Sequence, residues 1–267
     1  CMTKPLFMWA GGKTRLLKHY LPYLPKTVNT YYEPFFGGVA LYLYVMNNYK
    51  PKHAVINDIN TSITNIYIEI RDNIKEFISI VDELEFMYLS KTKEARKTYY
   101  FEVRNQHAYD YMQWSDTKEA AVLYFLMKTG FNGIFQINKN TNGRFGTPSG
   151  LLNQTTKVYE KDIVLHWNKL LINTEILSKD WNKLTYPDSD NTFIFFDPPY
   201  RDSFTSYGQA FDDVQQRALL AKAKSFTKSN VFLSNRDGND GFFDNIAPLN
   251  KLYIPVTYTA GRRKQTD

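Results

Sequence analysis

The chain of 267 residues has a single cysteine, Cys1, and no long apolar run. One cysteine excludes an intrachain disulfide and any zinc site built on several cysteines. No segment approaches the roughly 20 apolar residues that a membrane-spanning helix needs, and the first residues lack the apolar core of a signal peptide. These absences predict a cytoplasmic protein that does not cross a membrane.

Two common nucleotide-binding patterns are also missing, because neither GxGxxG nor GxxxxGK[ST] occurs in the sequence. The chain therefore lacks the usual signatures of dinucleotide hydride transfer and of phosphoryl transfer. Aromatic residues, in contrast, are frequent, with 20 Tyr and 19 Phe, and some of them are expected to stack on a planar ligand. The net charge of +6 suits a polyanionic partner, although many basic proteins bind none.

Strands alternate with helices at both ends of the chain, whereas the middle is helical and polar. Such alternation predicts βαβ units and a largely parallel sheet, hence an α/β fold. A stretch at 131–150, rich in glycine and asparagine, predicts a hairpin with a turn near Asn142-Gly143. Apolar periodicity predicts strands at 53–60, 193–196, 230–235 and 252–258, and helices within 63–84, 95–106, 120–128, 162–171 and 212–225.

Three acidic side chains, Glu33, Asp58 and Asp197, stand at the ends of predicted strands. Ligands of open parallel sheets lie outside the carboxyl ends of the strands, so the three acids are expected to share one site. After Glu33, the pair Gly37-Gly38 lets the backbone turn sharply into the next helix and lets a ligand approach closely. Asp58 is suited to accept hydrogen bonds from both ribose hydroxyls of a nucleoside cofactor, or to cap the helix that begins near Asn60.

The segment FMWAGGKTRLL, residues 7–17, has a glycine pair and Lys13 directly before a predicted helix. Lys13 could neutralise a carboxylate of a ligand, and Trp9 could pack on an aromatic ring. A capped surface helix is the simpler interpretation of these residues when they are taken alone.

The most specific pattern is FIFFDPPY, in which a strand buried on both faces runs into Asp197, Pro198, Pro199 and Tyr200. Proline fixes φ and has no amide donor, so a stiff segment holds the Asp197 carboxylate and a proline carbonyl as a pair of acceptors. Such a pair suits an exocyclic amino group with two N–H donors, and Tyr200 offers a face for the same ring. Accepting both hydrogens would draw the nitrogen lone pair out of conjugation with the ring. A strand-terminating turn explains one proline but not the order of acid, two prolines and aromatic.

Together with Trp-Ala-Gly-Gly-Lys at 9–13, Glu-Pro-Phe…Gly and Asp58, this tetrapeptide resembles the Dam family, or D12 class, of N6-adenine DNA methyltransferases. The motifs stand in the family's order over nearly the whole chain, and Leu233-Ser-Asn235 continues the resemblance. It implies a Rossmann-like methyltransferase sheet formed by 2–61 and 155–267. It also implies an inserted, mainly helical DNA-recognition domain at 62–154 that carries a β-hairpin near 131–148.

The resemblance further implies S-adenosyl-L-methionine as the methyl donor and an adenine of double-stranded DNA as the acceptor. Asp197, Pro198, Pro199 and Tyr200 would grip the adenine. No metal ion is implied, since the methyl group passes directly from sulfonium to nitrogen. An adenine within a duplex must be flipped out before it reaches such a pocket. The residues that the resemblance assigns to the cofactor are Trp9, Lys13, Glu33, Phe35, Gly37, Asp58 and Asp197.

Within the predicted hairpin, FNGIFQIN matches the family's recognition hairpin. The resemblance implies that Phe131 wedges into the base stack, that Asn132 meets the orphaned thymine and that Ile134 contacts a thymine methyl group. Packing within the hairpin explains the two apolar residues equally well. Arg144 and Lys139 are expected to contact phosphates of the DNA.

Two positions differ from family members that methylate GATC. Gln136 stands where they carry arginine, and Met8 stands where they carry a basic residue. Arginine reads guanine in a bidentate manner, whereas glutamine suits adenine, so the expected recognition site is GATC or a related short sequence. We also expect a monomer. A restriction partner, a phage counter-defence and a housekeeping mark would all use the same active site.

Other substrates and another class of protein stay open at this point. The same chemistry would serve an adenine of RNA. Asp197 disfavours cytosine N4 and a protein glutamine amide, since cytosine enzymes tend to carry serine there and glutamine enzymes asparagine. The alternative from a different class is a DNA-binding module with a decayed catalytic core, although every catalytic position named above is intact.

Overall fold

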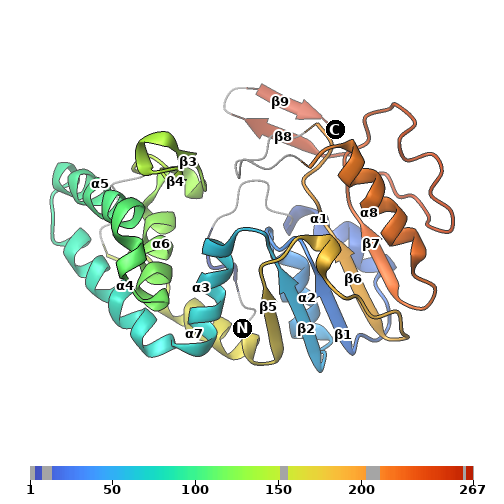
Figure 1. Ribbon diagram of the computed structural model, residues 1–267, viewed down its shortest axis with the longest axis horizontal. Coiled ribbons are helices and arrows are strands. Elements are labelled where there is room, and N and C mark those ends of the chain that lie inside the picture. Colours follow the sequence, from blue (N-terminus) through green and yellow to red (C-terminus); the bar gives the residue numbers. More distant parts are fainter. Residues whose placement is uncertain (1–3, 8–13, 151–155, 203–210, 261–262, 267) are drawn as a thin grey trace.

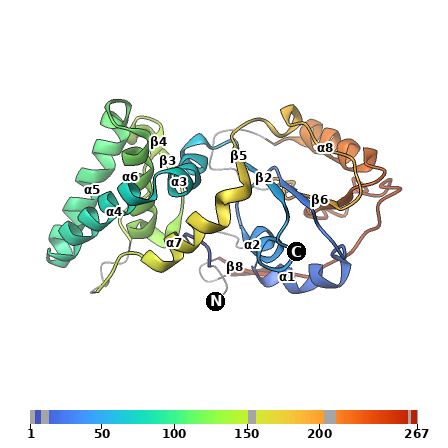
Figure 2. The same ribbon diagram turned by 90° about the horizontal axis from the view of Figure 1, so that it is seen from below.

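The computed structural model describes residues 4–7, 14–150, 156–202, 211–260 and 263–266 of the chain. Figure 1 shows a sheet that is flanked by helices and, beside it, a helical lobe that carries a small hairpin. In the perpendicular view of Figure 2, α7 (Lys161–Leu170) lies between the lobe and the sheet. Within the described ranges, no helix is both long and apolar enough to cross a membrane.

Five parallel strands form the central sheet in the order β5-β2-β1-β6-β7. The chain proceeds outward from β1 through β2 to β5, and then returns to put β6 on the other side of β1. The strand order therefore reverses between β1 and β6, which is where open α/β sheets bind their ligands. This arrangement confirms the predicted Rossmann-like α/β sheet. The strands span β1 Thr30–Glu33, β2 His53–Asn57, β5 Thr174–Leu177, β6 Thr192–Phe196 and β7 Asn230–Leu233.

Alternation of side chains along the central strands builds an apolar layer on each face of the sheet. Phe193 and Phe195 of β6 join the larger core cluster, while Ile194 and Phe196 join a smaller cluster. Successive side chains of a strand point to opposite faces, so a strand without polar alternation must be covered on both. All residues of β6 are buried, which confirms this prediction for the strand that precedes Asp197.

Different helices cover the two faces of the sheet. Most residues of α2 (Ala40–Asn48) are buried, and all of the buried ones except Ala40 belong to the larger cluster. The buried apolar residues of α8 (Asp213–Ser225) belong to the smaller cluster on the opposite face. Next to α2 lies α1 (Thr14–Tyr20), and the Tyr20 ring meets Phe195 edge-on at 5.8 Å. The helix α1 therefore extends the layer that α2 forms.

The lobe beside the sheet is built around α6, which is buried along nearly its whole length because α3, α4 and α5 pack around it. The predicted helix at 63–84 is wrong in one respect: it is two helices that meet at Asn73, whose φ of −136° is not helical. The Asn73 side chain donates a hydrogen bond to Glu69 at 3.1 Å. Apolar periodicity continues across this break and therefore did not indicate it. The helices span α3 Thr61–Asp72, α4 Ile74–Leu89, α5 Lys93–Asp110 and α6 Asp116–Thr129.

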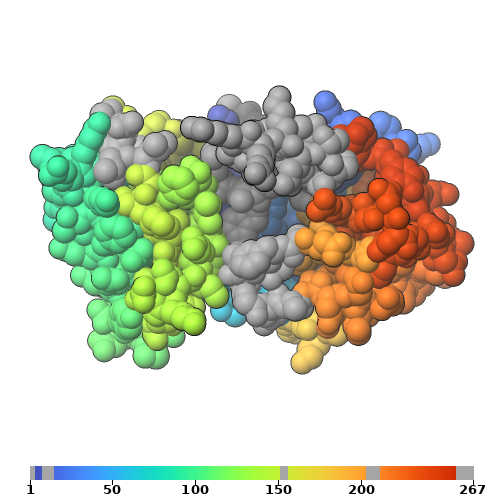
Figure 3. Space-filling model, turned by 90° about the horizontal axis from the view of Figure 1, so that it is seen from above, coloured from blue at the N-terminus to red at the C-terminus, as the bar shows by residue number. Residues whose placement is uncertain are grey.

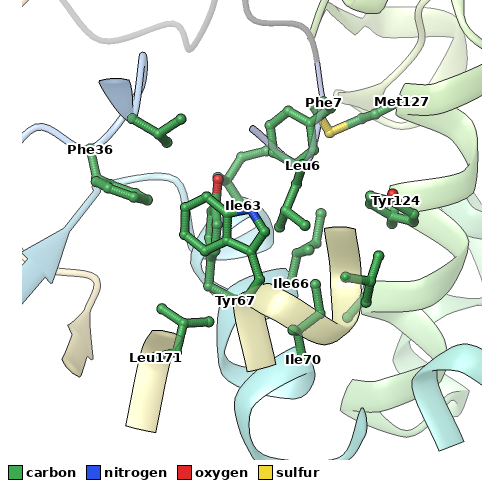
Figure 4. Packing of buried hydrophobic residues seen from close by; sticks show 14 of the residues in the cluster. Leu6, Phe7, Phe36, Ile63, Ile66, Tyr67, Ile70, Tyr124, Met127 and Leu171 are labelled. Atoms are coloured by element: carbon green, nitrogen blue, oxygen red, sulfur yellow. The ribbon is translucent and has the colours of Figure 1, made fainter. Parts of the chain in front are cut away.

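The lobe and the sheet share one hydrophobic core that passes through α3. Figure 4 shows Ile66 and Tyr67 of α3 between Phe36, which follows β1, and Met127 of α6. All of these side chains belong to the same buried cluster. The helix α3 thus packs against both the lobe and the sheet. Because the two parts share this core, the domain boundary predicted at 61/62 stays a prediction.

A short antiparallel hairpin projects from the lobe. It consists of β3 (Ile137–Asn138) and β4 (Arg144–Phe145), and Asn142 and Gly143 in its turn have positive φ angles of 60° and 69°. Asparagine and glycine tolerate this conformation best, which explains why this pair marks the turn in the sequence. Close packing restricts Gly146, where a Cβ atom would lie only 2.5 Å from side-chain atoms.

Near the carboxyl end, β8 (Thr257–Ala260) pairs with β9 (Arg263–Thr266) in an antiparallel manner. The predicted strand at 252–258 is wrong for most of its length, because 251–256 has no regular structure. Pro255 lies in this stretch and has no N–H group for a strand ladder. Short 3-10 helices span Leu21–Tyr23, Tyr111–Gln113, Phe131–Gly133, Lys139–Thr141, Leu171–Asn173 and Trp181–Lys183.

Candidate active site

Three acidic residues gather at one edge of the sheet. Glu33 is the last residue of β1, Asp58 follows the last residue of β2, and Asp197 follows the last residue of β6. These strands are neighbours and run parallel, so their carboxyl ends meet at the same edge. The predicted position of all three acids at strand ends is thereby confirmed.

A cavity lies between the ends of β1 and β6, where the strand order reverses. Glu33 and Asp197 both line it, together with residues 38–41 at the start of α2. Leu17 and Tyr20 of α1 complete its apolar wall. Sequence reasoning missed these two, because ordinary apolar residues of a helix give no sign of which cavity they will face.

The electrostatics of this cavity centre on Glu33, whose relative exposure is only 3%. Burial, and secondly the negative charge of Asp197, raise the pKa of Glu33 to about 8, although the Tyr31 hydroxyl opposes this by donating a hydrogen bond to Oε1. Near neutral pH most Glu33 side chains are therefore protonated. A cation bound in the cavity would favour the ionised carboxylate instead.

The turn after β1 contains a strained residue next to the cavity. The positive φ, 54°, falls on Val39 and on neither glycine of the turn. A β-branched residue with positive φ is rare, and such strain gathers at ligand sites. Gly38 lines the cavity, whereas Gly37 is not among the described residues that do. Phe35 and Phe36 pack in the two apolar clusters on opposite sides of the sheet.

Asn57, the last residue of β2, ties together the turns around the site. It is 1% exposed, and its Nδ2 atom donates to the carbonyl groups of Pro34 and Lys179, each at 2.9 Å. Its Oδ1 atom accepts a hydrogen bond from the N–H group of Lys179 at 2.9 Å. Asn57 thus fixes the turn after Glu33 relative to the turn that carries Asp58, a role that the sequence did not reveal.

Asp58 is not the cap of the helix that follows it. The cap is Asn60, whose side chain accepts hydrogen bonds from the N–H groups of Ser62 and Ile63 at 3.1 and 3.3 Å. The Asp58 carboxylate accepts from the N–H group of Asn60 at 2.9 Å. Surrounding protein atoms desolvate this carboxylate and raise the pKa of Asp58 to about 7, while the residue as a whole is half-buried.

The tetrapeptide after β6 is held from two sides. Asp197 Oδ1 accepts a hydrogen bond from the hydroxyl of Ser234, which follows β7. The carbonyl of Pro199 accepts one from the side chain of Gln216 in α8 at 2.8 Å. No residue in the described part of the chain donates to the carbonyl of Pro198. Of the two prolines, Pro198 is buried and Pro199 is half-buried, and only the Pro199 carbonyl accepts a hydrogen bond from a side chain of the described residues.

The residue after the half-buried Tyr200 anchors this segment further. Arg201 forms salt bridges with Asp213, at the start of α8, and with Asp240, at 3.0 and 2.8 Å. Its guanidinium group also lies over the ring of Phe242, 3.9 Å from the centroid. The backbone behind the tetrapeptide is thus attached to two other parts of the molecule.

The residues predicted to contact DNA lie in and beside the hairpin. Phe131, Asn132 and Gln136 are exposed, and Ile134 is half-buried. Asn132 adopts a positive φ of 53°, a conformation that asparagine tolerates better than most residues. Three of these side chains are thus available to a partner, and their roles stay predictions.

Arg144 is engaged within the lobe. Its guanidinium group donates to Glu119 at 3.0 Å and lies over the ring of Tyr111, 3.3 Å from the centroid. The buried His107 is 3.8 Å from the same Glu119 oxygen. The contact with Glu119 uses one nitrogen of the guanidinium group, and the phosphate contact of Arg144 stays a prediction.

A second hollow lies between the hairpin and the turn that carries Asp58. Residues 59–62 line one side of it, and Phe135, Ile137 and 143–145 line the other. Figure 3 shows the lobe and the α8 side of the sheet on either side of a dip in the surface. The hairpin and the turn that follows Asp58 therefore border the same hollow.

Some predicted residues lie outside the described part of the chain. These are Trp9 and Lys13, assigned to the cofactor, and Met8. Within the described part, no group of three or more His, Cys, Asp or Glu side chains is arranged to hold a metal ion.

The fold and this site define a class of protein. A Rossmann-like sheet with acids at the ends of adjacent strands is typical of enzymes that bind a nucleoside-containing ligand at the reversal of strand order. The stiff Asp-Pro-Pro-Tyr segment adds a carboxylate and two proline carbonyl groups at the same reversal.

Comparison with known proteins narrows this class. Residues 9–255 match the family model of the D12 class N6 adenine-specific DNA methyltransferases. Type II methyltransferase M.MjaIII of Methanocaldococcus jannaschii is 32% identical over 253 residues, which cover 90% of this chain and 86% of that protein. Type II methyltransferase M.CviBI of Paramecium bursaria Chlorella virus NC1A is 32% identical over 232 residues, covering 86% and 82%. Type II methyltransferase M1.LlaDCHI of Lactococcus lactis is 29% identical over 239 residues, covering 86% and 79%.

The chain therefore belongs to the D12 class family of N6 adenine-specific DNA methyltransferases, which confirms the resemblance found in its motifs. Its activity is the site-specific methylation of adenine in DNA.

Proposed function

We propose that S-adenosyl-L-methionine binds along the sheet edge that includes the small cavity between β1 and β6, and that the adjoining tetrapeptide binds a flipped-out adenine. One observation carries the proposal: the carboxyl groups of Glu33 and Asp197 line the same cavity. Two carboxyl groups suit the positive sulfonium and ammonium groups of this cofactor. Asp58 suits its ribose hydroxyls, and the roles of Trp9, Lys13, Phe35 and Gly37 are extended from the resemblance.

When bound, the cofactor supplies the methyl group, which passes to the adenine nitrogen as its bond to sulfur breaks. Asp197 and the Pro198 carbonyl accept the two hydrogens of the amino group and so make its lone pair available. The nitrogen must then lose one proton, and the Asp197 carboxylate is the group at hand to accept it. Tyr200 stacks on the base. Holding the nitrogen in place accounts for much of the rate acceleration in such a reaction.

The proposed DNA surface is the hairpin side of the hollow that lies between the hairpin and residues 59–62. Exposed Phe131, Asn132 and Gln136 can enter the duplex or a groove, which supports their roles in filling the gap and reading bases. Gln136 suits an adenine edge, so the proposed site is GATC or a related short sequence. Ile134 and Arg144 are half-buried, and Arg144 would offer a phosphate the guanidinium N–H groups that do not bond Glu119.

Incubation with radiolabelled S-adenosyl-L-methionine tests the proposed reaction. We expect label in duplex DNA and none in a matched RNA duplex, and we expect N6-methyladenine after enzymatic digestion and mass spectrometry. Sequencing of modified bases in DNA from cells that express the chain reports the recognition site. Labelling of RNA alone, or of cytosine, would overturn the proposal.

Cofactor binding has its own test, which needs no DNA. Titration calorimetry should detect binding of S-adenosyl-L-methionine, and the melting temperature should rise with its concentration, because a ligand of the folded state stabilises it by mass action. A folded protein that binds no S-adenosyl-L-methionine would contradict the proposed cofactor site.

Replacement of Asp58 should weaken the cofactor site specifically. Above the pKa of Asp58, which is about 7, Asp58→Asn keeps the shape of the side chain but removes its charge, and hydrogen bonds to a charged group contribute about 1.5–3 kcal/mol. We therefore expect the Kd for S-adenosyl-L-methionine to rise about 10-fold or more. Asp190→Asn removes the same charge from an exposed position and should leave the Kd unchanged. Equal Kd values for both variants would contradict the ribose role.

A further inference from the structure

Two side-chain amides bind the backbone on both sides of Tyr200. Gln216 of α8 is 2% exposed, and its Nε2 atom donates to the carbonyl of Pro199 at 2.8 Å. Its Oε1 atom accepts a hydrogen bond from Nδ2 of Asn235 at 2.7 Å. Asn235 Oδ1 in turn accepts from the N–H group of Arg201 at 2.9 Å. The peptide groups before and after Tyr200 are thus joined through one amide pair.

Backbone polarity determines how both amides are oriented. The Pro199 carbonyl can only accept, so the nitrogen of Gln216 must face it and the oxygen of Gln216 must face Asn235. The N–H groups of Arg201 and Arg236 can only donate, and both lie 2.9 Å from Asn235 Oδ1. Flipping either amide would bring two donors or two acceptors together. Each amide therefore has one arrangement that satisfies the whole chain of hydrogen bonds.

We propose that Gln216 and Asn235 are positioning residues that set the orientation of Tyr200, and through it that of the target adenine, for methyl transfer. This inference rests on the proposed assignment of residues 197–200 to the adenine. Pro198 and Pro199 cannot donate backbone hydrogen bonds. The amide pair engages the carbonyl group before Tyr200 and the N–H group after it, so a change in the backbone torsions of Tyr200 would break a hydrogen bond on one side.

Attachment of α8 to the sheet does not require the amides. The side chains of Leu219 and Ala223 pack α8 in the smaller apolar cluster, and Arg201 also binds its first turn through Asp213. The hydrogen bonds of the two amides reach the backbone on either side of Tyr200, which points to control of its position.

Gln216→Glu tests the proposal through its dependence on pH. The glutamate can still accept a hydrogen bond from Asn235, but when ionised it cannot donate to Pro199. At about pH 9.5, where the glutamate is mostly ionised, we expect kcat to fall on the order of 10²-fold, as for a small misplacement of a reacting group, with the KM for S-adenosyl-L-methionine unchanged. Burial raises the pKa of a carboxyl group. At about pH 6 the protonated glutamate should therefore donate to Pro199 again and recover a large part of the wild-type rate at that pH.

Gln215→Glu is the matched control, because it adds the same charge to the same turn of α8. Gln215 accepts a hydrogen bond from the indole of Trp181 at 3.2 Å, and a glutamate can accept it too. We expect this variant to keep the wild-type kcat at both pH values. Melting curves establish whether each variant is folded. If Gln216→Glu is not folded, Gln216→Met takes its place, because it removes the amide without adding charge. The methionine variant should show the loss in kcat at both pH values.

The outcomes separate this inference from the proposed function. A wild-type protein that transfers no methyl group to DNA overturns the proposed function itself. If the wild type is active, a folded Gln216 variant with wild-type kcat overturns only the positioning role. The positioning role is also overturned if the loss in kcat of Gln216→Glu is equal at both pH values, because a purely structural defect would not respond to protonation of the glutamate. A loss in kcat that recovers with acid supports the inference.

Discussion

Asp197→Ala should lower the rate of methyl transfer about 10³-fold or more, the size of effect seen when a key group of an active site is removed. The carboxylate has two proposed tasks, since it accepts a hydrogen of the adenine amino group and then its proton. Alanine can perform neither. Single-turnover transfer from labelled S-adenosyl-L-methionine to a duplex with the recognition site measures the loss directly.

Asp197→Asn separates the two tasks. Its amide oxygen can still accept a hydrogen bond, but a neutral acceptor binds roughly half as strongly as a charged one, and the amide takes no proton near neutral pH. We expect a rate between those of the wild type and Asp197→Ala. Both variants must melt normally and must still show a thermal shift with the cofactor. Wild-type transfer by a folded Asp197→Ala protein would contradict the mechanism.

Much of this site could be predicted from the sequence, because its acids follow strands. The apolar run of β6 has no polar alternation, and such a run in an α/β chain predicts a strand covered on both faces. In a parallel sheet the carboxyl ends of neighbouring strands share an edge. The positions of Glu33, Asp58 and Asp197 therefore follow from strand ends alone, before any side-chain contact is known.

The residues that hold the site together could not be predicted in this way. Gln216 and Asn235 act on Pro199 and Arg201 from separate elements, so their partners depend on how α8 and β7 pack. The same is true of Arg144, whose bond to Glu119 crosses from the hairpin to α6. Amide and guanidinium groups occur throughout the surface of a protein, and no local pattern distinguishes those that face a backbone group after folding.

The stability of the ligand-free protein should depend on pH through Glu33. In the unfolded chain this carboxyl group titrates near 4.5, whereas burial and Asp197 raise its pKa to about 8 in the folded state. Between these values the folded state holds a proton that the unfolded state has released. The free energy of unfolding therefore falls as pH rises, by up to about 1.4 kcal/mol per pH unit for one such group.

Glu33→Gln should remove most of this dependence, because glutamine has the same shape, does not titrate and can accept the hydrogen bond from Tyr31. Denaturant unfolding at pH values from 5 to 9 measures the free energy of unfolding of both proteins. In acid this free energy should be no higher for the variant than for the wild type, and in alkali it should be higher for the variant. Asp58, whose pKa is raised to about 7, accounts for the slope that remains. An unchanged slope in Glu33→Gln would contradict the raised pKa of Glu33.

The same carboxyl group links pH to cofactor binding. A sulfonium cation beside Glu33 favours the ionised form, so binding of S-adenosyl-L-methionine should release a proton and should tighten as pH rises toward 8. S-adenosylhomocysteine, whose sulfur is neutral, should release fewer protons, and calorimetry in buffers of different ionisation enthalpy counts them. In Glu33→Gln the difference between the two ligands should shrink. Equal proton release by both ligands in the wild type would mean that Glu33 faces their common ammonium group, which would leave Asp197 as the carboxylate beside the sulfur.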